Sequence, residues 1–270
     1  MFYLKQYDAR NLLSSRQKVV VVNLFSYELS YLSFIAFLFC GVLVGMAKTG
    51  VHGMGMIAVP ILAATFGGKT SSGLMLPMLI MADVFGVAYY HRHAEWKYLI
   101  KLFPWAILGV LLGTWTGNYI DDQLFRSIMG VIIFVSLGVM VWLERINKES
   151  IPDYWWFAMI LGVVAGFTTM VGNLAGSAMA LYLLSMRMPK NEFIGTAAWF
   201  FMAINWFKIP FHIWSWHTID LNSILLDLTV LPSIAVGAYL GINVIKKVSD
   251  QNFRWFIMVM TAVAAVFMVF

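Results

Sequence analysis

The sequence predicts an all-α polytopic membrane protein with two inverted-topology repeats, each containing long spanning helices and one short half-helix. Three observations predict this class: a very apolar composition, apolar runs along the whole chain, and matched polar residues in the two halves. Hydrophobic residues make up 61% of the 270 residues, charged residues make up 11%, and the mean hydropathy is +0.81. Soluble domains are about half apolar and about a quarter charged. The composition therefore excludes a water-soluble globule.

Polar residues divide the chain into eight candidate spans, each close to the roughly 20 residues that a membrane helix needs. They lie near 30–47, 71–91, 99–117, 124–143, 154–171, 192–213, 224–244 and 253–270. Two further apolar segments, 54–66 and 174–186, are too short to span, because 13 residues reach only about 20 Å as a helix. We predict half-length helices there.

Residues 1–29 form an N-terminal extension before the first span. Its apolar end, "VVVVNLFSYELS" at 19–30, either lies along the membrane interface or adds a crossing. The single cysteine, Cys40, lies inside the first apolar run, so it forms no intrachain disulfide and is expected to be a packing residue.

The chain is internally duplicated. Four residues recur 121 positions later: Gly41, Gly45, Gly55 and Lys69 match Gly162, Gly166, Gly176 and Lys190. Further along, "DQLFR" at 122–126 recurs as "DQNFR" at 250–254, an offset of 128. Low-complexity similarity does not predict matched charged residues at a constant offset. We therefore predict one integral membrane domain with repeats at 30–150 and 151–270.

Equivalent loops of the two repeats differ in charge. The loop 91–101 carries three lysines or arginines and its partner 213–222 carries none, whereas 118–123 carries none and its partner 245–251 carries two. Because lysine and arginine are enriched on the cytoplasmic side, the two repeats are expected to have opposite orientations in the membrane.

Glycine-rich breaks precede both short helices, as "AKTGVHGMG" at 47–55 and "TTMVGNLAG" at 168–176. Irregular backbone at membrane depth is tolerated only where it is buried in protein or lines a cavity. The start of a short helix favours anions, because its free N–H groups and its dipole both attract negative charge. Inverted repeats with interrupted helices are typical of secondary transporters, which bind substrate near the midplane.

The order of these motifs resembles the TauE/SafE sulfite exporter family over residues 30 to 270. The resemblance rests on "GVLVGMAKTGVHGMGMIAVPIL", "GGKTSSG", "HRHAEW" and "GVLLGTWTGNYI", repeated weakly as "GVVAGFTTMVGNLAGSAMALYLL", "MPKNEFIGT" and "GAYLGINVI". It implies a multi-pass anion permease of the plasma membrane, the inner membrane in bacteria, that carries sulfite, small organosulfonates or related sulfur anions. The chain departs from the usual glycines at His52 and Met54, and at Asn173 and Leu174 in the second loop.

Lys69 and Lys190 are the first candidates for anion binding. They are repeat equivalents, and each opens a long helix beside a hydrogen-bonding residue, Thr70 or Asn191. An inverted pair is expected to lie on opposite sides of a central cavity, where a small oxyanion needs positive charge. The alternative is a pair of interfacial lysines that reach to lipid headgroups.

Five other residues complete the candidate site. Asp83 carries a coupling proton, pairs with a lysine such as Lys48, or caps a broken helix, and Asn205, close to the equivalent place in the second repeat, is the matching coupling candidate. Lys208 contacts the anion or pairs with Asp83. His52 titrates near neutral pH or makes a structural hydrogen bond, and Asn173 stands at its place in the second break as a further substrate-binding candidate.

Two other function classes stay open. An uncoupled, channel-like anion uniporter shares the fold features. A membrane-embedded enzyme needs a clustered nucleophile, base or metal site, and the five histidines and one cysteine form no such cluster in the sequence. His91 and His93 are better explained by a solvated loop than by a metal site.

No cofactor, metal or nucleic acid partner is expected. The expected partners are the lipid bilayer and a small inorganic or organic sulfur anion, and no nucleotide-binding loop is present in the sequence. The small-residue series Gly109, Gly113, Gly117 and Gly237, Gly241 permits close helix contact within the bundle or between protomers. A homodimer therefore stays open.

Overall fold

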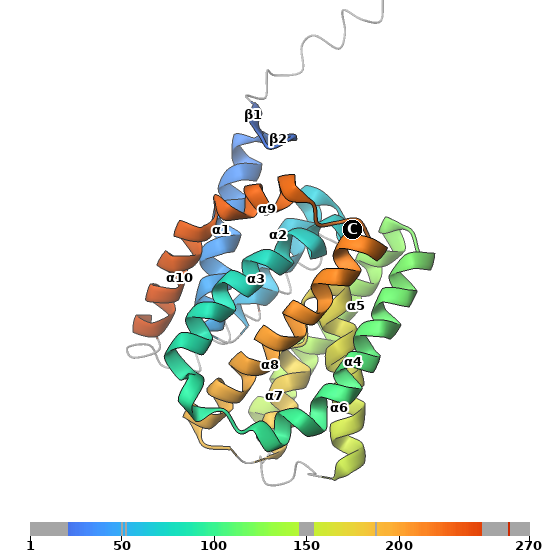
Figure 1. Ribbon diagram of the computed structural model, residues 1–270, viewed down its shortest axis with the longest axis vertical. Coiled ribbons are helices and arrows are strands. Elements are labelled where there is room, and N and C mark those ends of the chain that lie inside the picture. The colour runs from blue at the N-terminus through green and yellow to red at the C-terminus, as the bar shows by residue number, and fades with distance from the viewer. Residues whose placement is uncertain are drawn as a thin grey trace, which may run out of the picture.

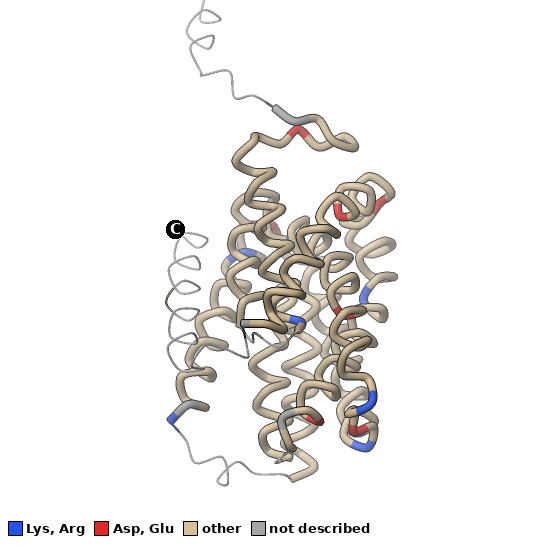
Figure 2. Tube along the Cα trace, turned by 90° about the vertical axis from the view of Figure 1, so that its left-hand side faces the viewer, with Lys and Arg blue, Asp and Glu red and all other residues tan. Residues whose placement is uncertain are grey.

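The computed structural model describes residues 21–49, 51, 53–145, 154–186, 188–244 and 259. These residues form a helix bundle with one short hairpin at one end (Figure 1). Charged residues are sparse along the helices (Figure 2). Among the described residues, five helices are long and apolar enough to cross a membrane: α1 (Tyr31–Lys48), α3 (Gly68–Tyr90), α4 (Trp96–Tyr119), α5 (Asp122–Arg145) and α6 (Trp155–Gly172). The predicted all-α, polytopic class is thus confirmed.

Two shorter apolar helices stand where half-length helices were predicted. They are α2 (Met54–Phe66), with 13 residues, and α7 (Gly176–Ser185), with 10 residues. The second is shorter than the predicted 174–186, because Leu174 and Ala175 lie in the turn that follows α6. Helices of this length reach only about 15–20 Å and cannot span the hydrocarbon core alone.

The predicted span 192–213 is α8 (Lys190–Pro210), which continues as a π-helix, η4 (Phe211–Ser215). The predicted span 224–244 is instead two helices, α9 (Leu221–Leu228) and α10 (Leu231–Val244), bent by 48°. Pro232 explains the break, because proline has no N–H to donate and is favoured in the first turn of a helix. The predicted last span, 253–270, lies outside the described residues apart from Val259.

The end of the N-terminal extension forms a β-hairpin. Strand β1 (Val21–Leu24) pairs antiparallel with β2 (Tyr27–Ser30), through a two-residue turn in which Phe25 and Ser26 have φ angles of 48° and 72°. Positive φ at both positions is typical of the tight turns that match strand twist. The idea of an additional crossing is therefore wrong, because four-residue strands cannot span a bilayer.

Two helix pairs make very close backbone contacts, α4 with α6 and α1 with α10 (Figure 1). Gly109 of α4 lies against the Val163 carbonyl of α6, and Gly237 of α10 lies against the Val42 carbonyl of α1. Backbones approach this closely only where no side chain intervenes. The glycines that left a homodimer open are therefore occupied inside one chain.

We expect Gly166→Ala to destabilise the α4–α6 pair. A Cβ at Gly166 would overlap the backbone of Ala106, and overpacking of this kind costs about 1–3 kcal/mol. Thermal unfolding in detergent should show a lower midpoint for Gly166→Ala. Gly138→Ala on α5 is the matched control, because no atom outside the adjoining backbone of α5 lies within 4 Å of its added Cβ. Equal midpoints for the two variants would contradict this packing.

Helices α3 and α8 lie side by side and antiparallel in the middle of the bundle (Figure 1). Gly73, near the start of α3, approaches Thr218, which follows η4, and Gly195, near the start of α8, approaches the Tyr90 carbonyl at the end of α3. The turn η2 (His91–His93) then leads to α4. The contact between α3 and α8 brings together buried polar side chains from both halves of the chain.

Candidate functional site

The polar stripe of α8, defined as Asn205 and Lys208 of α8 with His212 of the continuing η4, faces the inside of the bundle. Residues three or four positions apart lie on one face of a helix. These side chains are 1%, 0% and 0% exposed. Buried polar groups are costly in a membrane protein and are retained where they pair with one another or serve a function.

The Lys208 ammonium makes its hydrogen bonds with the C-terminal end of α6. Its Nζ donates to the Thr169 carbonyl (2.9 Å), the Thr169 hydroxyl (3.0 Å) and the Asn173 Oδ1 (2.6 Å). Asn173 has a φ of 57°, the left-handed conformation that commonly ends a helix. The last carbonyls of a helix carry partial negative charge, so they stabilise a cation. Within the described residues, no carboxylate forms an ion pair with Lys208.

Asn173 also connects the end of α6 to the start of α3. Its Nδ2 donates to the Ser72 carbonyl (3.1 Å), and the Ser72 hydroxyl donates to the Met170 carbonyl (3.2 Å). A chain of hydrogen bonds therefore runs from α3 through the α6 break to Lys208 on α8. Because every link is specific in geometry, the chain fixes the position of the ammonium group.

Asp83 of α3 faces Asn205, which lies one helical turn before Lys208 on α8. Its Oδ1 pairs with Lys48 Nζ at 2.7 Å, and its Oδ2 accepts from Asn205 Nδ2 at 2.7 Å. Lys48 is its partner in place of Lys208. Oδ1 has no further hydrogen-bond partner in the described part of the chain. The Lys48 ammonium also lies 4.1 Å from the centre of the Phe201 ring, a cation–π contact.

The buried charges do not cancel. Lys48 and Asp83 form an ion pair, whereas neutral acceptors surround Lys208, so with Lys208 protonated this group carries one net positive charge. Coulomb interactions are strong where water is excluded. The group is therefore suited to a small anion and unsuited to a cation.

His212 follows Lys208 by one turn, in the π-helix η4. Its Nδ1 lies 2.8 Å from the Thr218 hydroxyl, and its Nε2 is buried without a partner among the described residues. The ring packs edge-on against Trp216 at 5.0 Å. Short π-helical segments occur frequently at functional sites. His212 extends the polar stripe toward Lys69.

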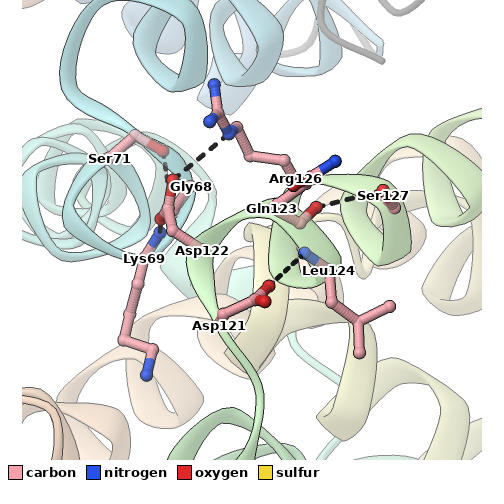
Figure 3. Close-up of polar contacts among 9 residues, drawn as sticks. All are labelled: Gly68, Lys69, Ser71, Asp121, Asp122, Gln123, Leu124, Arg126 and Ser127. Atoms are coloured by element: carbon pink, nitrogen blue, oxygen red, sulfur yellow. Dashed lines mark hydrogen bonds and ion pairs between the residues drawn. The ribbon is translucent and has the colours of Figure 1, made fainter.

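Lys69 lies in the first turn of α3, beside the start of α5. Its backbone N–H donates to Asp122 Oδ1 (3.1 Å), and Asp122 Oδ2 pairs with Arg126 Nε (3.2 Å), while the Lys69 side chain turns away from Asp122 (Figure 3). The Lys69 ammonium donates to the Gly117 carbonyl and lies 5.8 Å from the centre of the Trp216 ring. Trp216 thus stands between Lys69 and His212.

The predicted lysine pair lies at opposite ends of the α3–α8 contact. Lys69 begins α3 and Lys190 begins α8, and the two helices are antiparallel. With a rise of 1.5 Å per residue, the two helix starts are separated by about 30 Å. One small anion therefore cannot contact both lysines in this arrangement.

The remaining predicted residues fall into three situations. Thr70 is half-buried in the first turn of α3, and Asn191 is exposed in the first turn of α8. His52 lies outside the described residues, as does the Lys190 side chain. The structure brings together Asn173, Lys208, Asp83 and Asn205 in the interior.

Sequence reasoning missed Thr169, Ser72 and His212. The position of His212, four residues after Lys208, was a usable pattern, because both side chains then share a helix face. Thr169 and Ser72 had no comparable pattern, since each contacts the site through helix ends brought together by tertiary packing. The part of the chain that the structure describes contains no group of His, Cys, Asp and Glu suited to a metal ion.

The family of sulfite exporters matches most of this chain. The family model described as sulfite exporter TauE/SafE covers residues 35–268. The chain belongs to the TauE/SafE family. TauE/SafE proteins are membrane transporters and not enzymes. Membership therefore excludes the membrane-embedded enzyme and makes this chain a multi-pass membrane transporter of sulfur anions.

No curated protein and no solved structure matches the chain. Particular residues therefore have to be assigned to transport from the geometry of this TauE/SafE protein alone.

Proposed function

We propose that this chain is a secondary transporter that exports sulfite, or a related small sulfur oxyanion or organosulfonate, across the bacterial inner membrane by alternating access. The observation that carries the proposal is Lys208, a fully buried cation that no carboxylate neutralises among the described residues. A desolvated oxyanion requires such a compensating charge. The broken end of α6 then supplies hydrogen bonds around it.

The anion binds beside Lys208 in this proposal. An oxyanion accepts hydrogen bonds. When it binds, the Lys208 ammonium donates to the oxyanion and gives up part of its own hydrogen bonds to Thr169 and Asn173. Within the described residues the Thr169 hydroxyl only accepts from Lys208, so its own O–H is available to donate to the anion. A charged pair of this kind is stronger than the neutral contacts that it replaces.

Inverted repeats at 30–150 and 151–270 give this site two access routes. Contacts related by the repeat offsets support the duplication: Gly45 packs on Ile234, and Gly166, 121 residues later, packs on Ala106, 128 residues before Ile234. The same relation joins two further contact pairs: Gly41–Val230 with Gly162–Leu102, and Gly237–Val42 with Gly109–Val163. The antiparallel α3 and α8 also support the inversion.

The other predicted residues are assigned to the two ends of the transport pathway and to the two helix breaks. Lys69 with Thr70, and Lys190 with Asn191, stand at the two ends of the α3–α8 contact, where they attract anions to opposite openings. His52 and Asn173 are 121 residues apart in the sequence, at matching places in the two glycine-rich segments. Lys208 lies between these ends and is the central binding residue of the proposal.

Transport is proton-coupled in this proposal, and Asp83 is not favoured as the proton carrier. Its carboxylate is compensated both by Lys48 and by Asn205. A carboxylate with two charge-stabilising partners is best explained as a structural link between α1, α3 and α8. An uncoupled uniporter differs from this account only in the response of flux to an imposed pH gradient.

Efflux from proteoliposomes tests the proposed function. Vesicles containing the purified protein and radiolabelled sulfite should release the label with saturable kinetics, and unlabelled sulfite or a related sulfur anion should compete. Protein-free vesicles are the control for leakage. Release at the protein-free rate with every sulfur anion tested would contradict the proposed function.

A further inference from the structure

Asp227 is a buried carboxyl group that the proposed binding site does not use. It is 0% exposed, and neither of its side-chain oxygens has a hydrogen-bond partner within the described part of the chain. Almost all buried polar side chains have a partner, so each exception requires an explanation. Among the described carboxylates, Asp83 is also buried, but Lys48 and Asn205 hold it.

The position of Asp227 in α9 makes a lasting negative charge unfavourable. It lies in the last turn of α9, and its backbone carbonyl accepts the Val230 N–H (3.0 Å) at the 48° bend into α10. The end of a helix carries partial negative charge, which opposes a carboxylate. An ionised carboxylate without a partner in the interior is also very costly. Binding a proton removes both costs.

The charged groups near α9 do not neutralise Asp227. Across the described helices, Lys48 of α1 is paired with Asp83, and Lys69 of α3 donates to the Gly117 carbonyl. Asp220 caps the start of α9 through the Ser223 N–H (2.7 Å) and adds negative charge.

A titratable hydroxyl from the hairpin lies within electrostatic range of Asp227. Burial, followed by the Asp220 and Asp227 carboxylates, raises the pKa of the Tyr27 hydroxyl on β2. Helix α9 lies at the end of the bundle that carries the hairpin (Figure 1). Tyr27 is half-buried, so at the hairpin end a hydroxyl within electrostatic range of the buried carboxyl is also partly open to the outside.

Packing does not require an acid at this place. The residue 128 positions earlier, at the equivalent place in the first repeat, is Leu99. Leu99 is fully buried in α4, which runs without a break from Trp96 to Tyr119. At this position the first repeat has a leucine in a continuous helix, and the second repeat has an acid next to the bend between α9 and α10.

We infer that Asp227 is the group that binds and releases the coupling proton, at the bend of the broken α9–α10 span. A proton from the hairpin end forms an O–H bond with the carboxylate, and that bond breaks when the proton leaves on the other side. The α9–α10 bend changes in the same step. The inference rests on the proposed function, because it assigns the coupling step of the same transport cycle.

Two transport measurements on Asp227→Asn test this inference. Asparagine has nearly the same shape as the protonated acid but cannot exchange a proton. We expect accumulation of labelled sulfite driven by a pH gradient to be lost, while exchange of labelled for unlabelled sulfite without a gradient is retained. Asp220→Asn is the matched control, because asparagine also caps helices well and the residue is exposed. It should keep both activities.

Transport and infrared results together decide between the inference and its failure, and they separate that failure from a failure of the proposed function. Gradient-driven accumulation by Asp227→Asn at the wild-type level would overturn it, and so would accumulation that follows a sodium gradient and not a pH gradient. If Asp227→Asn loses both activities, infrared spectra of the wild type and of the variant decide whether Asp227 binds a proton. A carboxylic acid band that changes with pH in wild type and is missing in Asp227→Asn supports proton binding even if sulfite is not carried. If the wild type and Asp227→Asn show the same pH-dependent carboxylic acid band, or neither shows one, the inference is overturned whichever anion is transported.

Discussion

Lys208→Gln is expected to abolish sulfite flux in proteoliposomes. The substitution removes a buried charge that neutral groups surround, so the anion loses its main compensation. Truncating one partner of a buried, hydrogen-bonded charge pair costs about 2–5 kcal/mol, which corresponds to a decrease in flux of roughly thirtyfold or more. The measurement is the initial rate of labelled sulfite efflux at equal protein content.

Lys97→Gln is the control for this result. It makes the same chemical change on α4, at a side chain that is 64% exposed. Wild-type flux is expected from this variant. Thermal unfolding in detergent checks that Lys208→Gln is folded, because glutamine leaves Thr169 and Asn173 with fewer hydrogen bonds. A folded Lys208→Gln protein that transports at the wild-type rate would remove Lys208 from the site.

Asp83→Leu is expected to lower the stability of the protein more than Gly166→Ala does. It leaves the Lys48 ammonium uncompensated inside the bundle, where the Lys48 side chain is only 12% exposed. Removing one partner of a buried ion pair costs about 3–5 kcal/mol. The midpoint of thermal unfolding in detergent should therefore decrease strongly relative to wild type.

The double variant Lys48→Met, Asp83→Leu separates charge from packing. Replacing both members of a buried pair by apolar residues is often neutral or stabilising. We expect the double variant to regain most of the midpoint lost by Asp83→Leu. If it unfolds no later than the single variant, the loss comes from packing and the ion pair is not the stabilising element.

The helices were predictable from sequence because membrane spans are long apolar runs bounded by polar residues. Helix α2 has the bounds predicted for the first short helix, 54–66. The break between α9 and α10 was missed, because the residues on both sides are apolar and hydropathy does not register a change in helix direction. Pro232 was the one local indication.

The hairpin at Val21–Ser30 was also missed. The four consecutive valines at 19–22, the last two of which begin β1, fit a membrane helix and a strand equally well in composition, since β-branched residues are apolar and favour strands. A turn at Phe25 and Ser26, which have positive φ without glycine, gives little indication in the sequence.

The site was only partly predictable, because it depends on which helices touch. Reasoning from the repeats selected Lys69 and Lys190, which are equivalent in sequence but lie at opposite ends of the α3–α8 contact. The groups that meet in the interior, such as Lys208, Thr169 and Ser72, come from three helices. Their neighbourhood follows from tertiary packing, which a single sequence does not record.

Equilibrium binding of radiolabelled sulfite to the purified protein tests the central claim most directly. Wild type should bind one sulfite per chain with saturation, Lys97→Gln should bind equally well, and Lys208→Gln should show no saturable binding at the same concentrations. Binding of sulfite to folded Lys208→Gln with the wild-type affinity would contradict the assignment of the anion to the polar stripe of α8.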